Sequence, residues 1–476
     1  MTCSTHSDRI IERVYVRGIF ELTSPCIIGS GENDRADVDV VRDGKGRPYI
    51  PGTSLAGALR NFLESRQGTD DEKVQLMFGR RKDKYHDTTQ SRLYVSDACM
   101  DEGQDCSRMT TVRDGVRLDL DTKTAQKHKK FDYEVVEPGA KFVLKLELVL
   151  REKDQNRVKQ LEKMLFLILD AMIHQQISVG AKKRRGFGRG KLHSLEILRL
   201  DFCENQKQRD YVQQWLEFDW NSFKGNIELE QLDHTDVDLN RFPAAKKTCR
   251  LKVPLKLAYS LMIRNYRGLS PDRDADYAHL CSKENPVIPG TSWAGAFRHR
   301  MYRIVFHLFR SKGLEPAICD KYAQNILTDL FGEVVEKEKK AKASRIWFSE
   351  SVIENGQMIE QSRIKVDRFT GGVVNGALFQ EIPVYGGTTD LEIMIEARTE
   401  EELQEDLGLL VLALKDLMAG YLAVGGETNI GKGIFSGDKI LVYMQEKESL
   451  LDEAMEQQYF RALSRKIHRM ANGIQS

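Results

Sequence analysis

Alternating apolar and polar residues predict two similar β-strands, one near the N-terminus and one just beyond the middle of the chain. In the first, apolar residues from Val14 to Leu22 are separated by Arg17 and Glu21, and in the second, Leu251 to Leu257, lysines stand between the apolar positions. A period of two is typical of strands with one buried face. The same pattern in two places suggests that a larger unit is repeated.

Each strand is followed by the same succession of predicted elements. After a polar loop come a helix, a short strand, a charged segment, a longer alternating strand, an apolar-periodic helix and a final strand. The paired landmarks are the short strands at 92–96 and 345–349, the long strands at 142–150 and 391–395, and the second helices around 161–172 and 410–418.

The first helix of each unit begins with nearly the same eleven residues. Ile50–Arg60 and Ile288–Arg298 are identical at nine of the eleven positions. Proline restricts φ, glycine allows close backbone approach, and threonine or serine is expected to cap the first amides of a helix. Those amides carry the positive end of the helix dipole, a natural seat for phosphate. The predicted phosphate-contacting residues are Gly52, Thr53, Ser54 and Arg60, and in the second copy Gly290, Thr291, Ser292 and Arg298.

A charged, alternating segment follows in each copy and leads to a glutamate. Residues 111–122 precede Glu134, and residues 363–371 precede Glu381. Asp, Thr and Gly near the tip predict a β-hairpin that is too polar to be buried and stands away from its own core. Such an arm must contact something other than its own domain, and its candidate contact residues are the basic ones, Arg113, Arg117, Arg363 and Arg368.

A glycine-rich loop follows the second helix of each copy. The first loop, 180–190, combines glycine amides with one aromatic ring and a run of basic residues, a combination suited to single-stranded RNA. A solvated basic turn explains its composition equally well. The second loop, 425–433, has a single lysine and an acidic residue, so backbone amides would do most of the binding there. The candidate RNA-binding residues are Lys182, Lys183, Arg184, Arg185, Phe187, Arg189, Asn429 and Lys432.

The landmarks of the two copies keep nearly constant offsets, which indicates a tandem duplication. The offsets are 288 − 50 = 238 for the first helix, 381 − 134 = 247 for the glutamate and 425 − 180 = 245 for the glycine loop. The element order predicts an α+β chain of two tandem ferredoxin-like domains, the fold also found in RNA-recognition domains, each with a protruding hairpin. We expect domains at 1–200 and 249–445, a packed aromatic connector at 201–248 and a C-terminal helix within 446–476.

The amino-acid composition limits how the chain could bind nucleic acid, metal or a membrane. Lys and Arg total 72 against 71 for Asp and Glu, so affinity for nucleic acid has to come from local patches. The eight cysteines form no CxxC pair, and Cys99 and Cys106 with His86 match no standard zinc spacing. The most apolar runs are short or interrupted by charges, so we expect a cytoplasmic protein without membrane contact.

These motifs together resemble the RAMP superfamily, and most closely the backbone subunit of type III CRISPR effector complexes. The residues that carry the resemblance are the IPGTS helix start, the segment 112–117 leading through Phe131 to Glu134, and the GFGRG loop at 186–190. Two such units in one chain resemble the double backbone protein of subtype III-D. The resemblance implies binding of CRISPR RNA and a complementary single-stranded target RNA, assembly with other RAMP-type subunits, and a hairpin thumb that displaces one nucleotide per subunit.

In that family an aspartate in the loop before the first helix is required for target cleavage, and Asp37 best occupies its position. A carboxylate there acts as a base or holds a divalent ion, Mg²⁺ or Mn²⁺, beside a splayed nucleotide. Asp34 and Asp39 are rivals, and an ordinary loop aspartate is the plain alternative. The ungapped counterpart in the second copy is Ala275, flanked by Asp274 and Asp276, of which Asp276 is favoured.

Two other functions remain open on the sequence. A structural subunit that binds RNA without cutting it would use Asp37 only to shape the loop. A stand-alone endonuclease that processes CRISPR RNA usually relies on a histidine, and the ten histidines do not fall at matching positions in the two copies.

Overall fold

The computed structural model describes residues 8–29, 37–67, 71–80, 90–105, 109–118, 125–203, 207–237, 247–265, 275–335, 340–444 and 447–475. The chain divides into two compact units. Unit 1 comprises residues 1–111, 134–183 and 187–245. Unit 2 comprises residues 246–476 together with two short pieces of the first half, 112–133 and 184–186.

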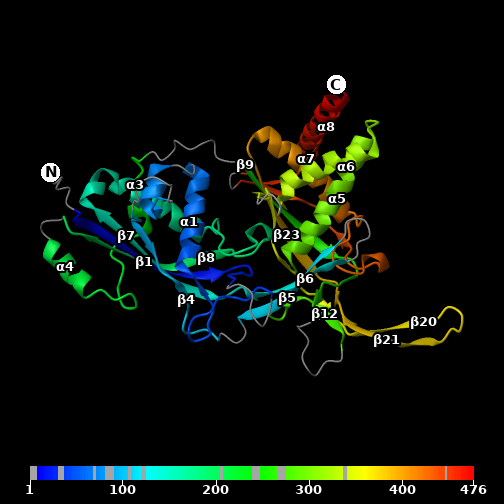
Figure 1. Cartoon of the computed structure of the whole chain (residues 1–476), viewed down its shortest axis with the longest axis horizontal. Coiled ribbons are helices and arrows are strands. Elements are labelled where there is room, and N and C mark those ends of the chain that lie inside the picture. The colour runs from blue at the N-terminus through cyan, green and yellow to red at the C-terminus, as the bar shows by residue number, and fades with distance from the viewer. Residues whose placement is uncertain are drawn as a thin grey trace. The chain divides into compact units, whose positions relative to one another are not determined.

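Unit 1 is built on an antiparallel sheet in which β1 lies between β7 and β8, while β3 and β4 pair with the other edge of β7. Helices α1 and α3 lie on one face of this sheet (Figure 1). The elements are β1 (Ile10–Leu22), β2 (Tyr49–Ile50), α1 (Gly52–Gln67), α2 (Glu72–Phe78), β3 (Leu93–Val95), β4 (Ala98–Met100), β7 (Lys141–Arg151), α3 (Val158–Ile173), β8 (Gly190–Asp201) and α4 (Gln208–Leu216).

Unit 2 repeats this arrangement. Strand β9 lies between β23 and β25, β17 pairs with the far edge of β23, and α5, α7 and α8 contribute to the core on one face. The main elements are β9 (Lys247–Leu257), α5 (Gly290–Arg310), α6 (Pro316–Phe331), β17 (Ile346–Phe348), β23 (Thr388–Ala397), α7 (Glu400–Met418), β24 (Phe435–Ser436), β25 (Leu441–Met444), β26 (Lys447–Leu450) and α8 (Glu453–Gln475). The predicted fold class is confirmed, because each unit has the strand order and helix placement of a ferredoxin-like domain.

The apolar half of each alternating strand forms the core. Val14, Val16 and Phe20 on β1 are fully buried among α1, α3 and β7, and Leu251 and Val253 on β9 are buried in the same way in unit 2. The alternation along each strand therefore determines which face of the sheet packs against the helices.

The opposite face of the unit 1 sheet is covered by the connector. Phe218 stacks on Tyr15 of β1 with a ring-centroid distance of 4.0 Å, and Trp220 meets the same ring edge-on at 5.4 Å. Arg17 fixes the connector backbone by donating a hydrogen bond to the Trp220 carbonyl oxygen at 2.8 Å. The connector is thus a packed layer of unit 1, and its aromatic rings occupy the face that RNA-recognition domains leave open for bases.

Two β-hairpins accompany the sheets. The first is formed by β5 (Thr110–Leu118) and β6 (Ala125–Val136), and the second by β20 (Gln361–Val366) and β21 (Val373–Ile382). The second hairpin extends away from the body of unit 2 (Figure 1). Phe369 at its turn is 96% exposed, as expected for an arm that meets another molecule.

The connecting segments of unit 2 contain several short strands. The sequence patterns did not predict these strands. They are β10 (Ser260–Leu261), β11 (Arg264–Asn265), β12 (Tyr277–His279), β13 (Cys281–Ser282), β14 (Asn285–Ile288), β15 (Glu333–Val335), β16 (Lys340–Lys342), β18 (Ser351–Val352), β19 (Gln357–Met358) and β22 (Val384–Tyr385).

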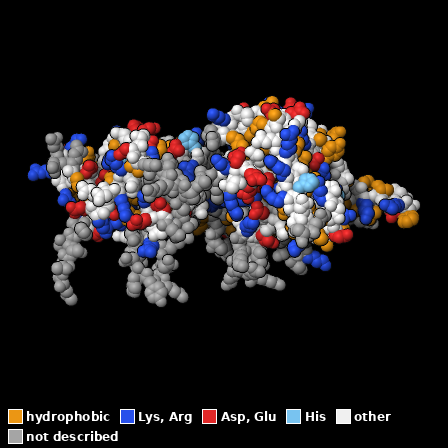
Figure 2. Space-filling view, turned by 90° about the horizontal axis from the view of Figure 1, so that it is seen from above, with side chains coloured by type: hydrophobic (Ala, Val, Ile, Leu, Met, Phe, Trp, Pro, Cys, Tyr) orange, Lys and Arg blue, Asp and Glu red, His pale blue; other side chains and the backbone are white. Residues whose placement is uncertain are grey.

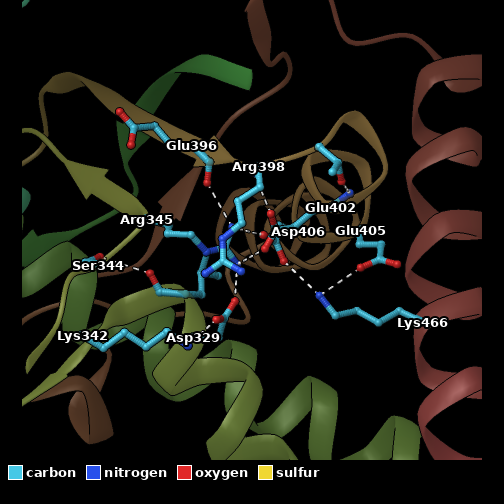
Figure 3. Close-up of polar contacts among 12 residues, drawn as sticks. Asp329, Lys342, Ser344, Arg345, Glu396, Arg398, Glu402, Glu405, Asp406 and Lys466 are labelled. Atoms are coloured by element: carbon cyan, nitrogen blue, oxygen red, sulfur yellow. Dashed lines mark hydrogen bonds and ion pairs between the residues drawn. The ribbon is translucent and has the colours of Figure 1, made fainter. Parts of the chain in front are cut away.

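Helix α8 is fastened to α7 by apolar packing and by a buried ion-pair network. Tyr459 and Leu463 are buried against the unit 2 core. Asp406 of α7 accepts hydrogen bonds from Arg345 at 2.6 Å and from Lys466 of α8 at 3.3 Å (Figure 3). The C-terminal helix is therefore part of unit 2.

Candidate nucleic-acid interface

The repeated helix begins at its glycine, before the threonine and serine that the sequence predicted as caps. Helix α5 starts at Gly290 with Pro289 at its N-cap, and no side chain caps it. Ser292 donates its backbone N–H to the Pro289 carbonyl oxygen at 2.9 Å, and Ser54 does the same to Pro51. The prediction of a Thr or Ser cap is therefore wrong for α5. Thr53 is exposed, whereas Ser54, Thr291 and Ser292 are half-buried on the first turns.

The glycine that opens each helix allows the helix start to approach a strand closely. A Cβ on Gly52 would overlap the carbonyl oxygen of Val95 at the end of β3, and a Cβ on Gly290 would overlap that of Phe348 at the end of β17. Glycine is required here by protein backbone rather than by a ligand.

An acidic residue lies directly after the strand in both halves. Asp97 accepts a hydrogen bond from the Gly52 N–H at 2.7 Å. One of the backbone amides that were predicted to bind phosphate is therefore already hydrogen-bonded to a carboxylate. Its counterpart by position, Glu350, forms an ion pair with Arg113 of the first hairpin. Arg113 is only 1% exposed, so its guanidinium faces protein. The side chain of Arg117 lies outside the described residues.

The arginines on the first helices differ between the halves. Arg60 donates to Glu64 at 2.7 Å and to the Gly79 carbonyl oxygen at 3.1 Å, which holds its guanidinium along α1. Arg298 has tyrosine four residues later in place of that glutamate. Burial lowers the pKa of Arg185, and the positive charge of Arg298 lowers it further.

Residues 184–186 thus belong to the α5 start in unit 2. The Arg185 carbonyl oxygen lies so close to Gly290 that a Cβ there would overlap it. Arg184 stacks on Trp347 of β17, with its guanidinium carbon 3.8 Å from the ring centroid, and lies 3.8 Å from Glu396. The basic part of the first loop and the second copy of the IPGTS motif form one cationic corner, which we define as Arg184, Arg185 and Arg298.

The remaining residues of the first loop lie in unit 1. Phe187 is 2% exposed, so its ring packs inside the protein and does not face solvent. Lys182 has a positive φ of 51°, and Lys183 and Arg189 are half-buried.

In the second glycine loop the single lysine is buried in ion pairs and is not exposed for binding. Lys432 is 3% exposed and lies 2.6 Å from Glu381 and 2.8 Å from Glu427. Arg363 of the second hairpin pairs with the same two glutamates, at 2.5 and 3.1 Å. Asn429 and, on the hairpin turn, Arg368 are exposed.

Asp37 lies exposed on a loop that is tied to the base of the first hairpin. Glu134 donates its N–H to the carbonyl oxygen of Val38 at 2.9 Å, and its carboxylate accepts from the Val40 N–H at 3.0 Å and from Arg42 at 2.5 Å. This anchoring holds the backbone on the C-terminal side of Asp37. Asp39 is 7% exposed and points into the protein, whereas Asp34 lies outside the described residues.

Asp276 has a corresponding place in unit 2. Tyr277 lies opposite Glu381 in the β12–β21 pairing, so Asp276, like Asp37, directly precedes a residue beside the hairpin-base glutamate. One Asp276 carboxylate oxygen accepts the Gln380 N–H at 2.9 Å. Asp274 and the possible cysteine-site residues Cys106 and His86 lie outside the described residues. Within the described ranges, no group of three or more His, Cys, Asp or Glu side chains is arranged to hold a metal ion.

The RAMP superfamily model matches residues 19–192 and 282–436, which together cover more than half of the chain. The chain belongs to the RAMP superfamily. Both matched regions contain an IPGTS helix start, so this RAMP protein carries two CRISPR-associated domains in tandem. No curated protein matches its sequence. None of the helices in the described part of the chain is both long and apolar enough to cross a membrane.

Sequence reasoning found the residues of the cationic corner but not their grouping. Arg185 and Arg298 were assigned to different copies, and only the fold brings them together. The Lys432 ion pair was also missed. Its one available signal was Glu427, an acidic residue inside a loop expected to bind anions.

Proposed function

We propose that this RAMP protein is a backbone subunit of a type III CRISPR ribonucleoprotein, with the tandem form of subtype III-D, and that it binds CRISPR RNA along its cationic corner. The observation that carries the proposal is the close packing of the Arg185 backbone against Gly290 at the start of α5, the helix that also carries Arg298. Two guanidinium groups that repel each other are stabilised by an anion between or beside them, and arginine pairs suit the phosphates of a nucleic-acid backbone.

Sequence choice in this proposal belongs to base pairing between guide and target, while the protein contacts backbone and shape. Phe187 is buried and Lys432 is ion-paired, so RNA contact falls on arginines and backbone rather than on a stacked ring. The exposed second hairpin, with Phe369 at its turn, is the arm proposed to meet RNA and a neighbouring subunit.

We further propose that the protein cleaves target RNA in the assembled complex, with Asp37 as the catalytic carboxylate and Asp276 as its counterpart. Both side chains are on exposed positions directly before a residue that lies beside a hairpin-base glutamate. A splayed nucleotide can place its 2′-hydroxyl in line with the next phosphate, and a carboxylate can remove the hydroxyl proton. A Mg²⁺ or Mn²⁺ ion at Asp37 would take most of its ligands from RNA phosphates and water and would stabilise charge on the reacting phosphate.

The test is target cleavage by the complex assembled with guide and matching RNA. Wild type, Asp37→Ala, Asp276→Ala and the double variant are compared with and without Mg²⁺, with Asp438→Ala as an exposed control. Loss of a catalytic carboxylate should slow cutting at its own position about 10²–10⁴-fold. Undiminished cutting by the double variant rejects the site, and intact RNA with the wild-type complex favours a scaffold without cleavage.

A further inference from the structure

Two neighbouring helices of unit 2 lack acidic residues over long stretches. Helix α5 contains no Asp or Glu from Gly290 to Arg310, and α8 contains none from Gln457 to Gln475. The counterpart of α5 in the first half, α1, carries Glu64. Both unit 2 helices nevertheless carry several basic residues.

Exposed basic residues form a row on each helix. On α5 they are Arg303, His307 and Arg310, and on α8 they are Arg461, Arg465 and His468, with Arg469 exposed beside them and paired with Glu401 and Glu405. Both rows follow the spacing i, i+4, i+7, which places the side chains on one face of a helix. We call these six residues the α5–α8 basic face.

The two rows meet at the end of α5. Lys312, two residues beyond the helix, lies with its Nζ 2.8 Å from Nε2 of His468. The ammonium group can only donate hydrogen bonds, so the Nε2 atom of His468 is the acceptor in this contact. This contact brings the C-terminal part of α8 to the last turn of α5.

Carboxylates pair with several other basic residues of these helices. The half-buried Lys466 of α8 pairs with Glu405, the exposed Arg469 pairs with Glu401 and Glu405, and Arg300 of α5 pairs with Asp416 at 2.6 Å. In the described part of the chain, the four arginines of the basic face form no ion pair. Arg310 donates to the Leu314 carbonyl oxygen and Arg461 to the Gln457 amide oxygen. The acidic residue closest in sequence to the end of α5 is Glu315.

The chemistry of the face favours nucleic acid over a protein partner. In the described parts of α5 and α8 no large apolar side chain is exposed, whereas the centre of a protein–protein interface is usually apolar or aromatic. Between the basic residues lie small polar groups such as Ser464. Figure 2 shows Lys and Arg side chains (blue) on the right-hand part of the face in view, with Asp and Glu side chains (red) among them.

We propose that the α5–α8 basic face binds a second stretch of single-stranded RNA, continuous with the strand held at the cationic corner. This inference rests on the proposed function. Arg298 lies two turns into the same helix, and Arg303 follows five residues later, about 7.5 Å along the axis and about 140° around it, so an RNA strand that contacts both has to wrap around α5. The 21 residues of α5 extend over about 30 Å, the length of several nucleotides. Helix α8 lies outside the regions matched by the family model, whereas α5 lies inside the second of them.

The test is binding of oligouridine to the full-length protein, measured by fluorescence anisotropy over a salt series. An RNA of about 5 nucleotides fills one site, and one of about 20 can reach both. The triple variant Arg303→Gln, Arg310→Gln, Arg465→Gln is compared with a control at three exposed basic positions of the same unit, Arg398→Gln, Lys439→Gln and Lys447→Gln.

For the long RNA, removal of three phosphate contacts should reduce the slope of log K against log salt by about 2. The short RNA and the control variant should show unchanged slopes. The corresponding three arginine-to-lysine changes should retain most of the binding, because lysine keeps the charge. The targeted side chains are exposed, so melting temperatures should match the wild type and identify any variant that does not fold.

Three results would overturn the inference. In the first, the triple variant binds long RNA normally, while the double variant Arg185→Gln with Arg298→Gln has a lower affinity for both RNAs. The basic face is then not an RNA site, but the proposed function stands. If neither set of changes alters binding, both proposals are wrong. If RNA binding is unchanged and the triple variant instead loses an acidic subunit of the complex, the face is a protein interface.

Discussion

Lys432 lies with its Nζ 2.6 Å from Oε1 of Glu381, and both side chains are almost fully buried in unit 2. The pair joins the second glycine loop to the base of the second hairpin. Because a buried charge without a partner is costly, Lys432→Met should destabilise unit 2 by about 3–5 kcal/mol in denaturant unfolding. The exposed control Lys439→Met should change stability little.

The double variant Lys432→Met with Glu381→Gln tests whether charge is the cause. Removing both charges should restore much of the stability lost in the single variant. A single variant as stable as the wild type would show that the pair does not hold the loop.

Glu427 is the third member of this network, and its lowered pKa leads us to expect that unit 2 loses stability in acid. Burial alone would raise its pKa, but hydrogen bonds from Lys432 and Arg264 outweigh burial and lower the pKa to about 2. A depressed carboxyl pKa gives stability that is present above the unfolded-state value of about 4.5 and is lost as pH falls toward 2. Unfolding of Glu427→Gln followed against pH should show a weaker acid dependence over this window.

The helix-opening glycines predict opposite effects for two neighbouring substitutions. Gly290→Ala should destabilise unit 2, because its Cβ would overlap the Phe348 carbonyl oxygen. Gly295→Ala, in the same helix with nothing within 4 Å of the added Cβ, should stabilise by about 0.5–1 kcal/mol through helix propensity. Thermal unfolding of the two variants separates these outcomes, and equal effects would argue against close packing at the helix start.

A buried carboxylate pair predicts pH-dependent stability in unit 1. Arg199 bridges Glu12 at 2.9 Å and Glu162 at 3.1 Å, and His234 of the connector lies 2.6 Å from Glu162. Burial, with the charge of Glu162, raises the pKa of Glu12 to about 8 against the opposing effect of Arg199.

A raised carboxyl pKa favours folding below the unfolded value of about 4.5, and this contribution is lost as pH rises through 8. Glu12→Gln should therefore be more stable than the wild type at pH 9 and show a flatter profile between pH 4.5 and 8. The free energy of unfolding measured over this range checks the prediction, and parallel profiles would contradict it.

The repeated motifs predicted the fold well, because strand alternation and constant offsets depend on local sequence. The site was predicted less completely. Lys432 among glycines suggests a solvent-exposed phosphate ligand, and its burial depends on Glu381, 51 residues away. Similarly, Gly290 suggested approach to a ligand, while the close approach is to Phe348. Both depend on contacts made only when distant segments pack together.

The most direct test of the account is the affinity of the full-length protein for single-stranded RNA when Arg298 is changed to Gln. The account predicts weaker binding and a salt slope reduced by about 0.7 per lost phosphate contact, with a similar loss for Arg185→Gln. Arg60→Gln, at the equivalent position of the first helix but already paired with Glu64, should have the smaller effect. RNA affinity and salt slope unchanged in both Arg298→Gln and Arg185→Gln would contradict the cationic corner as the RNA-binding site.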